Sequence, residues 1–99
     1  LLLTKTSSQS FVTMASYQIE WRNSTRREIR RIDRSMIPRI LEAVESLANE
    51  PRPIGCKKMQ GSECAYRIRI GNYRVIYEIF DDKVIIEVIR VGHRRDIYE

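Results

Sequence analysis

Alternating apolar and polar residues mark the first patterned segment of the chain. Tyr17, Ile19 and Trp21 are separated by polar residues, which is the period of two typical of a strand with one buried face. The polar pair at residues 23–24 ends the alternation. We therefore expect a half-buried strand over residues 17–21.

The spacing then changes to that of helices. Thr25 with Glu28 three residues later has the form of a capping box. Ile29, Ile32 and Met36 follow at intervals that place them on one helical face. The pattern predicts a short amphipathic helix whose other positions are mostly arginine.

A second helix is expected directly afterwards, with Ser35 as its N-cap and Pro38 in its first turn. Its wide apolar stripe runs down to Asn49 and consists of Ile37, Ile40, Leu41, Val44, Leu47 and Ala48. A link of roughly one or two residues between the helices predicts an antiparallel helical hairpin that lies on a sheet.

Three strands are expected after the helices, over residues 64–70, 73–80 and 83–91. Short polar turns separate them, so they should form an antiparallel meander. The third strand is largely apolar on both faces, which is typical of a central strand. Gly92 is expected to end it.

Together these elements predict an α+β fold in a domain that covers residues 17–99: an N-terminal strand, a two-helix antiparallel hairpin and a three-stranded antiparallel meander. A chain of 99 residues has room for one core only. Residues 1–16 show neither period, and we expect a disordered N-terminal extension or a leader there.

The charges narrow the class of partner. Eighteen Lys and Arg oppose thirteen Asp and Glu, for a net charge of +5, and fourteen of the eighteen cations are Arg. Guanidinium groups match the geometry of phosphate, so the bias indicates a polyanionic partner.

Other features of the composition exclude several kinds of site. One histidine and two cysteines provide neither a zinc ligand set nor a disulfide framework, and no glycine-rich phosphate loop is present. We expect no metal, no cofactor and no membrane partner, and a reducing, cytoplasmic location.

Candidate chemistry gathers on the strand over residues 64–70. Arg67 and Arg69 project from one face, about 7 Å apart, and Glu63 is the only acid among residues 57–77. If the strand ends meet, this face also receives Arg74, His93, Arg94 and Tyr98. The pattern leaves two interpretations open, an anion-binding site or a solvated sheet face.

Two longer strings resemble a known family. The order of elements, with YRIRIGNYRVIYEI at 66–79 and VIRVGHRRDIYE at 88–99, resembles the RelE toxins of type II toxin–antitoxin systems, within the RelE/ParE superfamily. The resemblance covers residues 17–99. It implies an mRNA interferase that cuts messenger in the ribosomal A site by metal-independent attack of the RNA 2′-hydroxyl. It also implies a RelB-like antitoxin partner in a toxin–antitoxin heterocomplex.

The resemblance assigns roles to individual positions. Phosphate-binding and transition-state cations fall at Arg67, Arg69, Arg74 and Arg94, an acid or base at His93, and a catalytic or base-stacking tyrosine at Tyr98. Arginine stays charged in proteins, so the acid or base must be His93 or Tyr98. RNA and ribosome contacts are expected from Arg26, Arg27, Arg30, Arg31, Lys57, Lys58 and Arg95.

Two other functions remain open at this point. A ParE-type toxin on the same fold would poison DNA gyrase without cutting RNA, and it would need no acid or base at His93. A non-catalytic RNA-binding module would bind RNA with strong salt dependence and release no cut product.

Overall fold

A computed structural model describes residues 16–97 of the chain, so the extension expected over residues 1–16 lies almost wholly outside the described residues. No helix in the described range is long and apolar enough to cross a membrane. The elements of this range, in chain order, are β1 (Gln18–Trp21), α1 (Asn23–Ile29), α2 (Ile37–Ser46), β2 (Lys57–Lys58), β3 (Ala65–Ile70), β4 (Tyr73–Phe80) and β5 (Ile85–His93).

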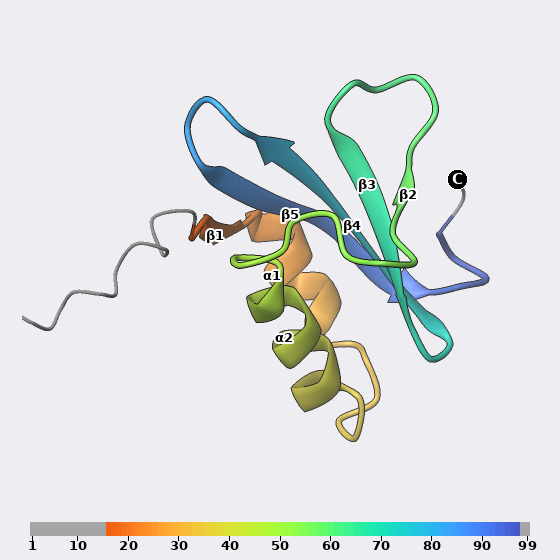
Figure 1. Cartoon of the computed structure of the whole chain (residues 1–99). Helices are drawn as coiled ribbons and strands as arrows, with labels where there is room; N and C mark the ends of the chain where they lie inside the picture. Colours follow the sequence, from red (N-terminus) through yellow and green to blue (C-terminus); the bar gives the residue numbers. More distant parts are fainter. Residues whose placement is uncertain (1–15, 98–99) are drawn as a thin grey trace, which may run out of the picture.

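The strands form one mixed sheet in the order β1-β5-β4-β3-β2. β1 runs parallel to β5, and every other neighbouring pair is antiparallel. The chain leaves the sheet along α1, returns along α2 and then forms the meander (Figure 1). This arrangement confirms the predicted α+β class, the β3-β4-β5 meander and the interior position of β5.

The sheet differs from the prediction at two places. β2 consists of two lysines, which carry no apolar alternation and therefore gave no strand signal. The last strand does not end before Gly92 but continues to His93. Gly92 keeps an ordinary negative φ, unlike the positive-φ glycine at the β3-β4 turn, and it pairs with Arg74 across the ladder.

The connection between the helices is longer than expected. α1 ends at Ile29 and α2 begins at Ile37, so residues 30–36 form a loop instead of a link of one or two residues. Ile32 in this loop is 7% exposed and belongs to the core. Its helical spacing from Ile29 reflects burial under a turn rather than continuation of the helix.

The predicted capping box at the start of α1 is wrong. The N-cap is Arg22, with no side-chain cap, and Thr25 lies inside the helix, fully buried. The Thr25 hydroxyl donates to the Val88 carbonyl oxygen at 3.0 Å, and Glu28 Oε1 accepts from the Val91 amide at 2.9 Å. Both side chains therefore attach α1 to β5 rather than satisfy the first turn of the helix.

We expect Thr25→Val to lower the free energy of unfolding by about 1 to 2 kcal/mol, because an isosteric methyl group leaves the Val88 carbonyl without its buried donor. Equilibrium denaturation with urea measures the change. Ser24→Ala, at an exposed position one residue earlier, is the control and should change stability by less than about 0.5 kcal/mol. Equal values for the two variants would mean that the hydroxyl has no stabilising role.

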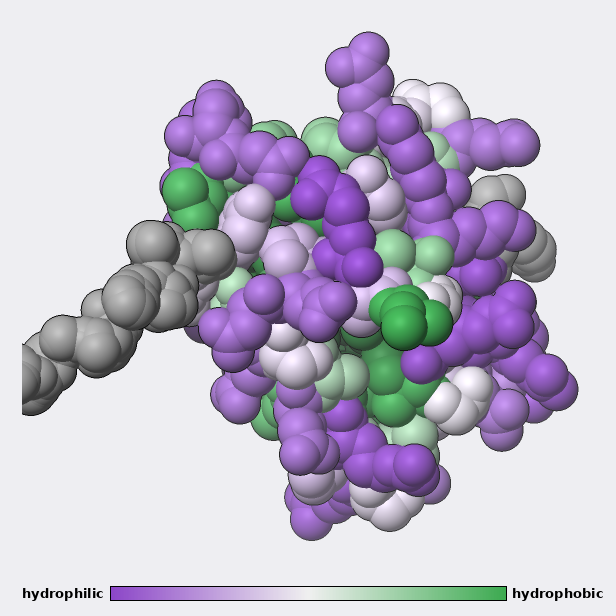
Figure 2. Space-filling view, in the orientation of Figure 1, coloured by the Kyte–Doolittle hydropathy of each residue, from purple (hydrophilic) through white to green (hydrophobic). Residues whose placement is uncertain are grey.

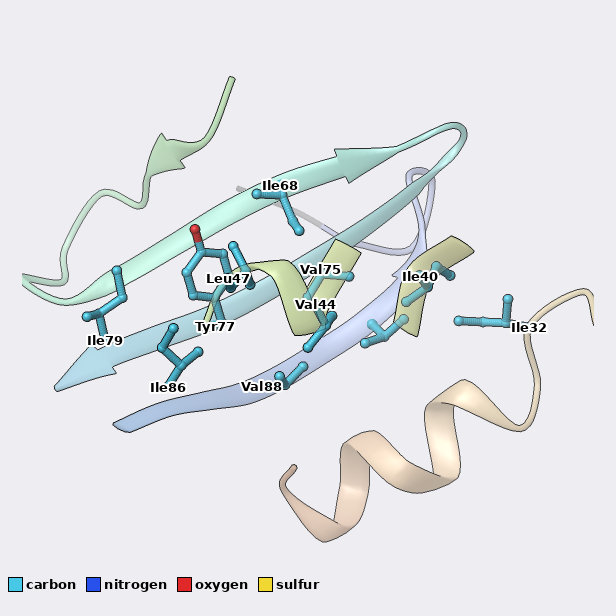
Figure 3. Packing of buried hydrophobic residues seen from close by; sticks show 11 residues of the cluster. Ile32, Ile40, Val44, Leu47, Ile68, Val75, Tyr77, Ile79, Ile86 and Val88 are labelled. Atoms are coloured by element: carbon cyan, nitrogen blue, oxygen red, sulfur yellow. The ribbon is translucent and has the colours of Figure 1, made fainter. Parts of the chain in front are cut away.

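α2 supplies the helical half of the core. Ile40, Val44 and Leu47 are fully buried and point toward the strands (Figure 3), as the apolar stripe predicts, while Leu41 remains partly exposed. The expected Ser35 cap is wrong, because the Ser35 amide and hydroxyl both bind Asp33 Oδ1 at 3.0 Å. The N-cap position belongs to Met36.

A β-bulge interrupts the β4-β5 ladder. Tyr77 pairs with Val88, but Ile76 pairs with Arg90, so Ile89 is an extra residue in β5. One extra residue reverses which side chains of the strand face the helices. Accordingly Val88 and Val91, three positions apart, both lie in the core.

Candidate functional site

The face of the sheet opposite the helices carries the two arginines of β3. Tyr66, Ile68 and Ile70 contact the core on the helical side, so Arg67 and Arg69 between them project from the other side, as predicted. Arg67 is only 3% exposed whereas Arg69 is exposed. The strand thus holds one guanidinium group within the protein surface and presents the next to solvent.

Neighbouring strands add cations to this face. Arg69 is directly opposite Arg74 of β4, and Arg67 is directly opposite Lys57 of β2. Opposite residues of an antiparallel pair project from the same face. A basic strip therefore crosses β2, β3 and β4, and Lys57 joins it through a short strand that the sequence pattern did not reveal.

The backbone of the β3-β4 turn orients Arg74. Its Nη1 donates to the carbonyl oxygens of Gly71 at 3.2 Å and Tyr73 at 3.0 Å. The turn is tight because Gly71 adopts φ of 60°, a conformation that glycine reaches at low cost. Two fixed acceptors on one nitrogen hold the guanidinium in place and leave its other donors for a ligand.

Arg94 reaches the same turn from the end of β5. Its backbone amide donates to the Asn72 carbonyl oxygen at 2.7 Å, which anchors the residue beside the β3-β4 turn. We call Arg67, Arg69, Arg74 and Arg94 the arginine cluster. The sequence placed these four together as a conditional expectation, and the structure brings them together.

The members of the arginine cluster act on one another electrostatically. Burial, followed by the charges of Arg69 and Arg74, lowers the pKa of Arg67. Burial, followed by the charges of Arg69 and Arg94, lowers the pKa of Arg74. An arginine remains charged after such shifts, so the cluster keeps a concentrated positive potential that an anion would relieve.

Three carboxylates of the described range form ion pairs away from the arginine cluster. The ion pairs join Arg22 to Glu87, Arg52 to Asp81 and Arg90 to Glu28. Within residues 16–97, no carboxylate forms an ion pair with Arg69, Arg74 or Arg94. The described part of the chain also contains no group of three or more His, Cys, Asp or Glu able to hold a metal ion.

The segment after β5 folds back over the arginine face. Ile97 is 4% exposed, and its Cδ1 and Cγ1 lie 3.2 and 3.3 Å from the place that a Cβ on Gly92 would occupy. The Ile97 side chain therefore packs against Gly92 at a point where a side chain on residue 92 would crowd it. Tyr98, the predicted tyrosine, is the next residue and lies outside the described residues.

His93 does not join the arginines. It pairs with Tyr73, whereas Arg74 pairs with Gly92. The imidazole meets the Tyr73 ring edge to face, with centroids 5.4 Å apart. Because Tyr73 packs against the core, His93 lies on the helical side of the sheet, and the expectation of one shared face is wrong for this residue.

The residues predicted to contact RNA and the ribosome fall in three places. Arg26 and Arg27 are exposed on α1, and Arg30 and Arg31 are exposed just after it. Lys58 pairs with Tyr66 and so projects from the side opposite to Lys57. Arg95 is exposed in the turn after β5.

A hollow of about 640 Å³ lies beside the edge of β3. It is bounded by α2, by residues 53–57 and by β3, including Arg67 and Arg69. Figure 2 shows hydrophobic residues gathered where the chain after α2 passes the sheet, on a face that is otherwise mostly hydrophilic. β2 pairs with Tyr66 and Arg67, and the Met59 amide donates to the Ala65 carbonyl oxygen at 2.8 Å. Among the described residues no strand pairs with the Ile68–Ile70 end of this edge.

Sequence reasoning missed the residues that position the site. Asn72 anchors Arg94, Tyr73 holds His93, and Ile97 closes over Gly92. The two-residue turn at 71–72 was a usable signal for the role of Asn72, because such a turn sets the register of the β3-β4 hairpin. The contacts of Tyr73 and Ile97 depend on the bulge and on the path of the chain after β5, which no local pattern specifies.

Comparisons with known proteins all match this chain to toxins of one superfamily. A family model described as "ParE toxin of type II toxin-antitoxin system, parDE" matches residues 19–98. Toxin RelG of Mycobacterium tuberculosis is 28% identical over 83 residues, which cover 83% of this chain and 95% of RelG. The mRNA interferase toxin RelE of Escherichia coli K12 is 26% identical over 81 residues, which cover 80% of this chain and 84% of RelE.

Solved structures agree with these matches. A chain of the toxin–antitoxin complex RelBE2 from M. tuberculosis has a TM-score of 0.71 at 25% identity, covering 82% of this chain and 94% of its own length. A chain of the RelB-RelE antitoxin–toxin complex from Methanococcus jannaschii has a TM-score of 0.64 at 28% identity, covering 80% of this chain and 94% of its own length.

Proposed function

This chain belongs to the RelE/ParE superfamily of toxins from type II toxin–antitoxin systems, and we propose that, as a RelE-like toxin, it cuts messenger RNA in the ribosomal A site. The observation that carries the proposal is the arginine cluster, which gathers guanidinium groups of β3, of β4 and of the turn after β5 on the face opposite the core helices. Its distant relatives include mRNA interferases named RelE.

In the proposed reaction the 2′-hydroxyl of the messenger attacks the adjacent phosphorus. The new bond joins the 2′-oxygen to phosphorus, and the bond from phosphorus to the 5′-oxygen breaks. The 2′-hydroxyl loses its proton and the leaving 5′-oxygen gains one, so the products are a 2′,3′-cyclic phosphate and a 5′-hydroxyl. Negative charge builds up on the non-bridging oxygens, which guanidinium groups held in advance stabilise more than they stabilise the substrate.

The proposed roles within the cluster follow from burial and anchoring. Arg67, inside the surface, and Arg69, beside it, bind the phosphate. Arg74, oriented by two carbonyl oxygens, contacts the non-bridging oxygens as charge develops. Arg94 adds a fourth charge from the end of β5. Arginine does not release its proton, and His93 lies on the other face of the sheet from Arg74, so proton transfer is assigned to Tyr98.

Docking on the ribosome is proposed for cations outside the cluster. Arg26, Arg27, Arg30 and Arg31 form an exposed basic surface on and after α1, and Arg95 adds a charge near the site. Contacts of such residues with RNA backbone depend strongly on salt and are not sequence-specific.

A RelB-like antitoxin is the proposed protein partner, since several similar solved structures are toxin–antitoxin complexes. The open edge of β3 suits addition of a strand from the partner. The adjacent hollow between α2 and β3 offers apolar contacts, with Arg67 and Arg69 at its border. An acidic segment placed there would neutralise the charges that the reaction uses.

The second candidate is a DNA gyrase poison. It is favoured by one observation, that the matching family model is described as a ParE toxin. A gyrase poison needs a basic surface but no group that transfers a proton to a 5′-oxygen. The two candidates therefore differ in their requirement for Tyr98.

Tyr98→Phe tests this difference. We expect the parent protein to produce cuts in a defined message during translation, mapped by primer extension. We expect the variant to cut about 10² times more slowly, because the ring is kept while the ionisable hydroxyl is lost. Intact message with the parent, together with trapped gyrase–DNA complexes, would replace the interferase by the gyrase poison. Parental cutting by the variant would remove Tyr98 from proton transfer.

A further inference from the structure

His93 occupies a place in the fold that connects the two faces of the sheet. Its imidazole lies on the helical side, edge-on to Tyr73. Its own backbone continues directly into the chain that crosses to the arginine face, where Arg94 and Ile97 lie. The residue therefore stands at the point where the chain changes faces.

The turn after β5 is held by hydrogen bonds at consecutive residues. His93 Nδ1 accepts from the Arg95 amide at 3.3 Å, and the His93 carbonyl oxygen accepts from the Asp96 amide at 2.8 Å. The amide of the preceding residue, Arg94, donates to the Asn72 carbonyl oxygen. The imidazole is the only side chain in this set, so residue 93 decides whether the Arg95 amide has its partner.

We propose that His93 is a positioning residue whose Nδ1, as a hydrogen-bond acceptor, holds the turn that places Arg94 on the arginine face. This inference rests on the proposed function, because Arg94 belongs to that site. It assigns His93 a role different from the acid or base that the resemblance implies.

The placement of the ring supports this role over direct proton transfer. Arg74 and Gly92 lie on one face, and Tyr73 and His93 lie on the other. Nδ1 is engaged by the backbone, which leaves Nε2 as the remaining ring nitrogen. The hollows beside the ring are lined by charges of both signs from every surrounding element: Glu28, Arg31, Asp33, Arg39, Arg90 and Asp96. None of these belongs to the arginine cluster.

Two replacements of His93 distinguish the role of its hydrogen-bond acceptor from the role of its aromatic ring. Asn at position 93 has a side-chain oxygen that can accept from the amide two residues later, as in an Asx turn, but it has no titratable nitrogen. Phe keeps the edge-on contact with Tyr73 but has no acceptor. A positioning role requires the acceptor, whereas acid–base catalysis requires the imidazole.

The full chain is assayed for cleavage of a translated message, and amide hydrogen exchange is measured at Arg95 by NMR. We expect His93→Asn to retain cleavage within about threefold, and His93→Phe to lose about tenfold, which is the effect of one lost anchoring hydrogen bond. Exchange at Arg95 should match the parent in the Asn variant and be faster in the Phe variant.

Other outcomes overturn the inference. Equal, large losses of cleavage in both variants, with Arg95 exchange preserved in His93→Asn, would make His93 an acid or base. Parental cleavage and exchange in His93→Phe would show that the turn does not need the side chain. If the parent itself cuts no message, the proposed function fails, while the exchange comparison still decides whether His93 holds the turn.

Discussion

Replacing Arg74 by alanine is expected to slow cleavage of a translated message by about 10² to 10³-fold, the usual effect of removing one preorganised donor from a developing oxyanion. Arg74 is the member of the cluster whose Nη1 the turn carbonyls hold and whose pKa is lowered by burial and then by the charges of Arg69 and Arg94. It is therefore both oriented and close to two other charges.

The same replacement should leave the fold intact. Arg74 makes no ion pair with a described carboxylate, and its removal relieves repulsion from two guanidinium groups. The midpoint of thermal unfolding should stay constant or rise. Arg74→Lys keeps the charge without the fork and should lose about tenfold, an intermediate amount.

Lys83→Ala is the matched control for charge. It removes one cation from the turn between β4 and β5, at the other end of these strands from the β3-β4 turn (Figure 1). Cleavage by this variant should equal that of the parent. An equal loss in Lys83→Ala and Arg74→Ala would reduce the cluster to non-specific attraction for RNA, and parental cleavage by Arg74→Ala would exclude Arg74 from the site.

Tyr77→Ala is expected to lower the free energy of unfolding by about 3 to 5 kcal/mol, the usual cost of truncating a large buried ring. Tyr77 is fully buried, its ring stacks on Tyr66 with centroids 6.1 Å apart, and its hydroxyl donates to the Pro51 carbonyl oxygen at 2.7 Å. Burial also raises its pKa, so the hydroxyl stays protonated and remains a donor.

Tyr77→Phe divides this effect into its parts. It keeps the ring and removes only the bond that ties the chain after α2 to β4, so we expect a loss of about 1 to 2 kcal/mol. Denaturant titration followed by circular dichroism measures both variants. Domains of this size have a total free energy of unfolding of only about 5 to 15 kcal/mol. Tyr77→Ala should therefore unfold at a much lower denaturant concentration than the parent. Equal losses in the two variants would assign the stability to the hydrogen bond and not to packing.

The parts of the fold that could be predicted rest on short-range patterns. Alternation located β1, β3 and β4 within about one residue, and the apolar stripe of α2 identified Ile40 and Val44 as core. The missed parts depend on partners far away in the sequence. Thr25 has the local signature of a cap, yet its hydroxyl binds Val88, 63 residues later, and β2 is strand only because β3 is beside it.

The candidate site shows the same division. By itself the sequence determined that Arg67 and Arg69 share a face, because side chains alternate along any strand whatever packs against it. The two-residue turn then places Arg74 opposite Arg69. Only the tertiary structure decided the face of His93. Strict alternation from Val88 would put His93 among the arginines, but the extra residue Ile89 reverses the last part of β5. Both faces of that strand are largely apolar, so alternation alone does not locate the bulge, which is set by pairing with β4.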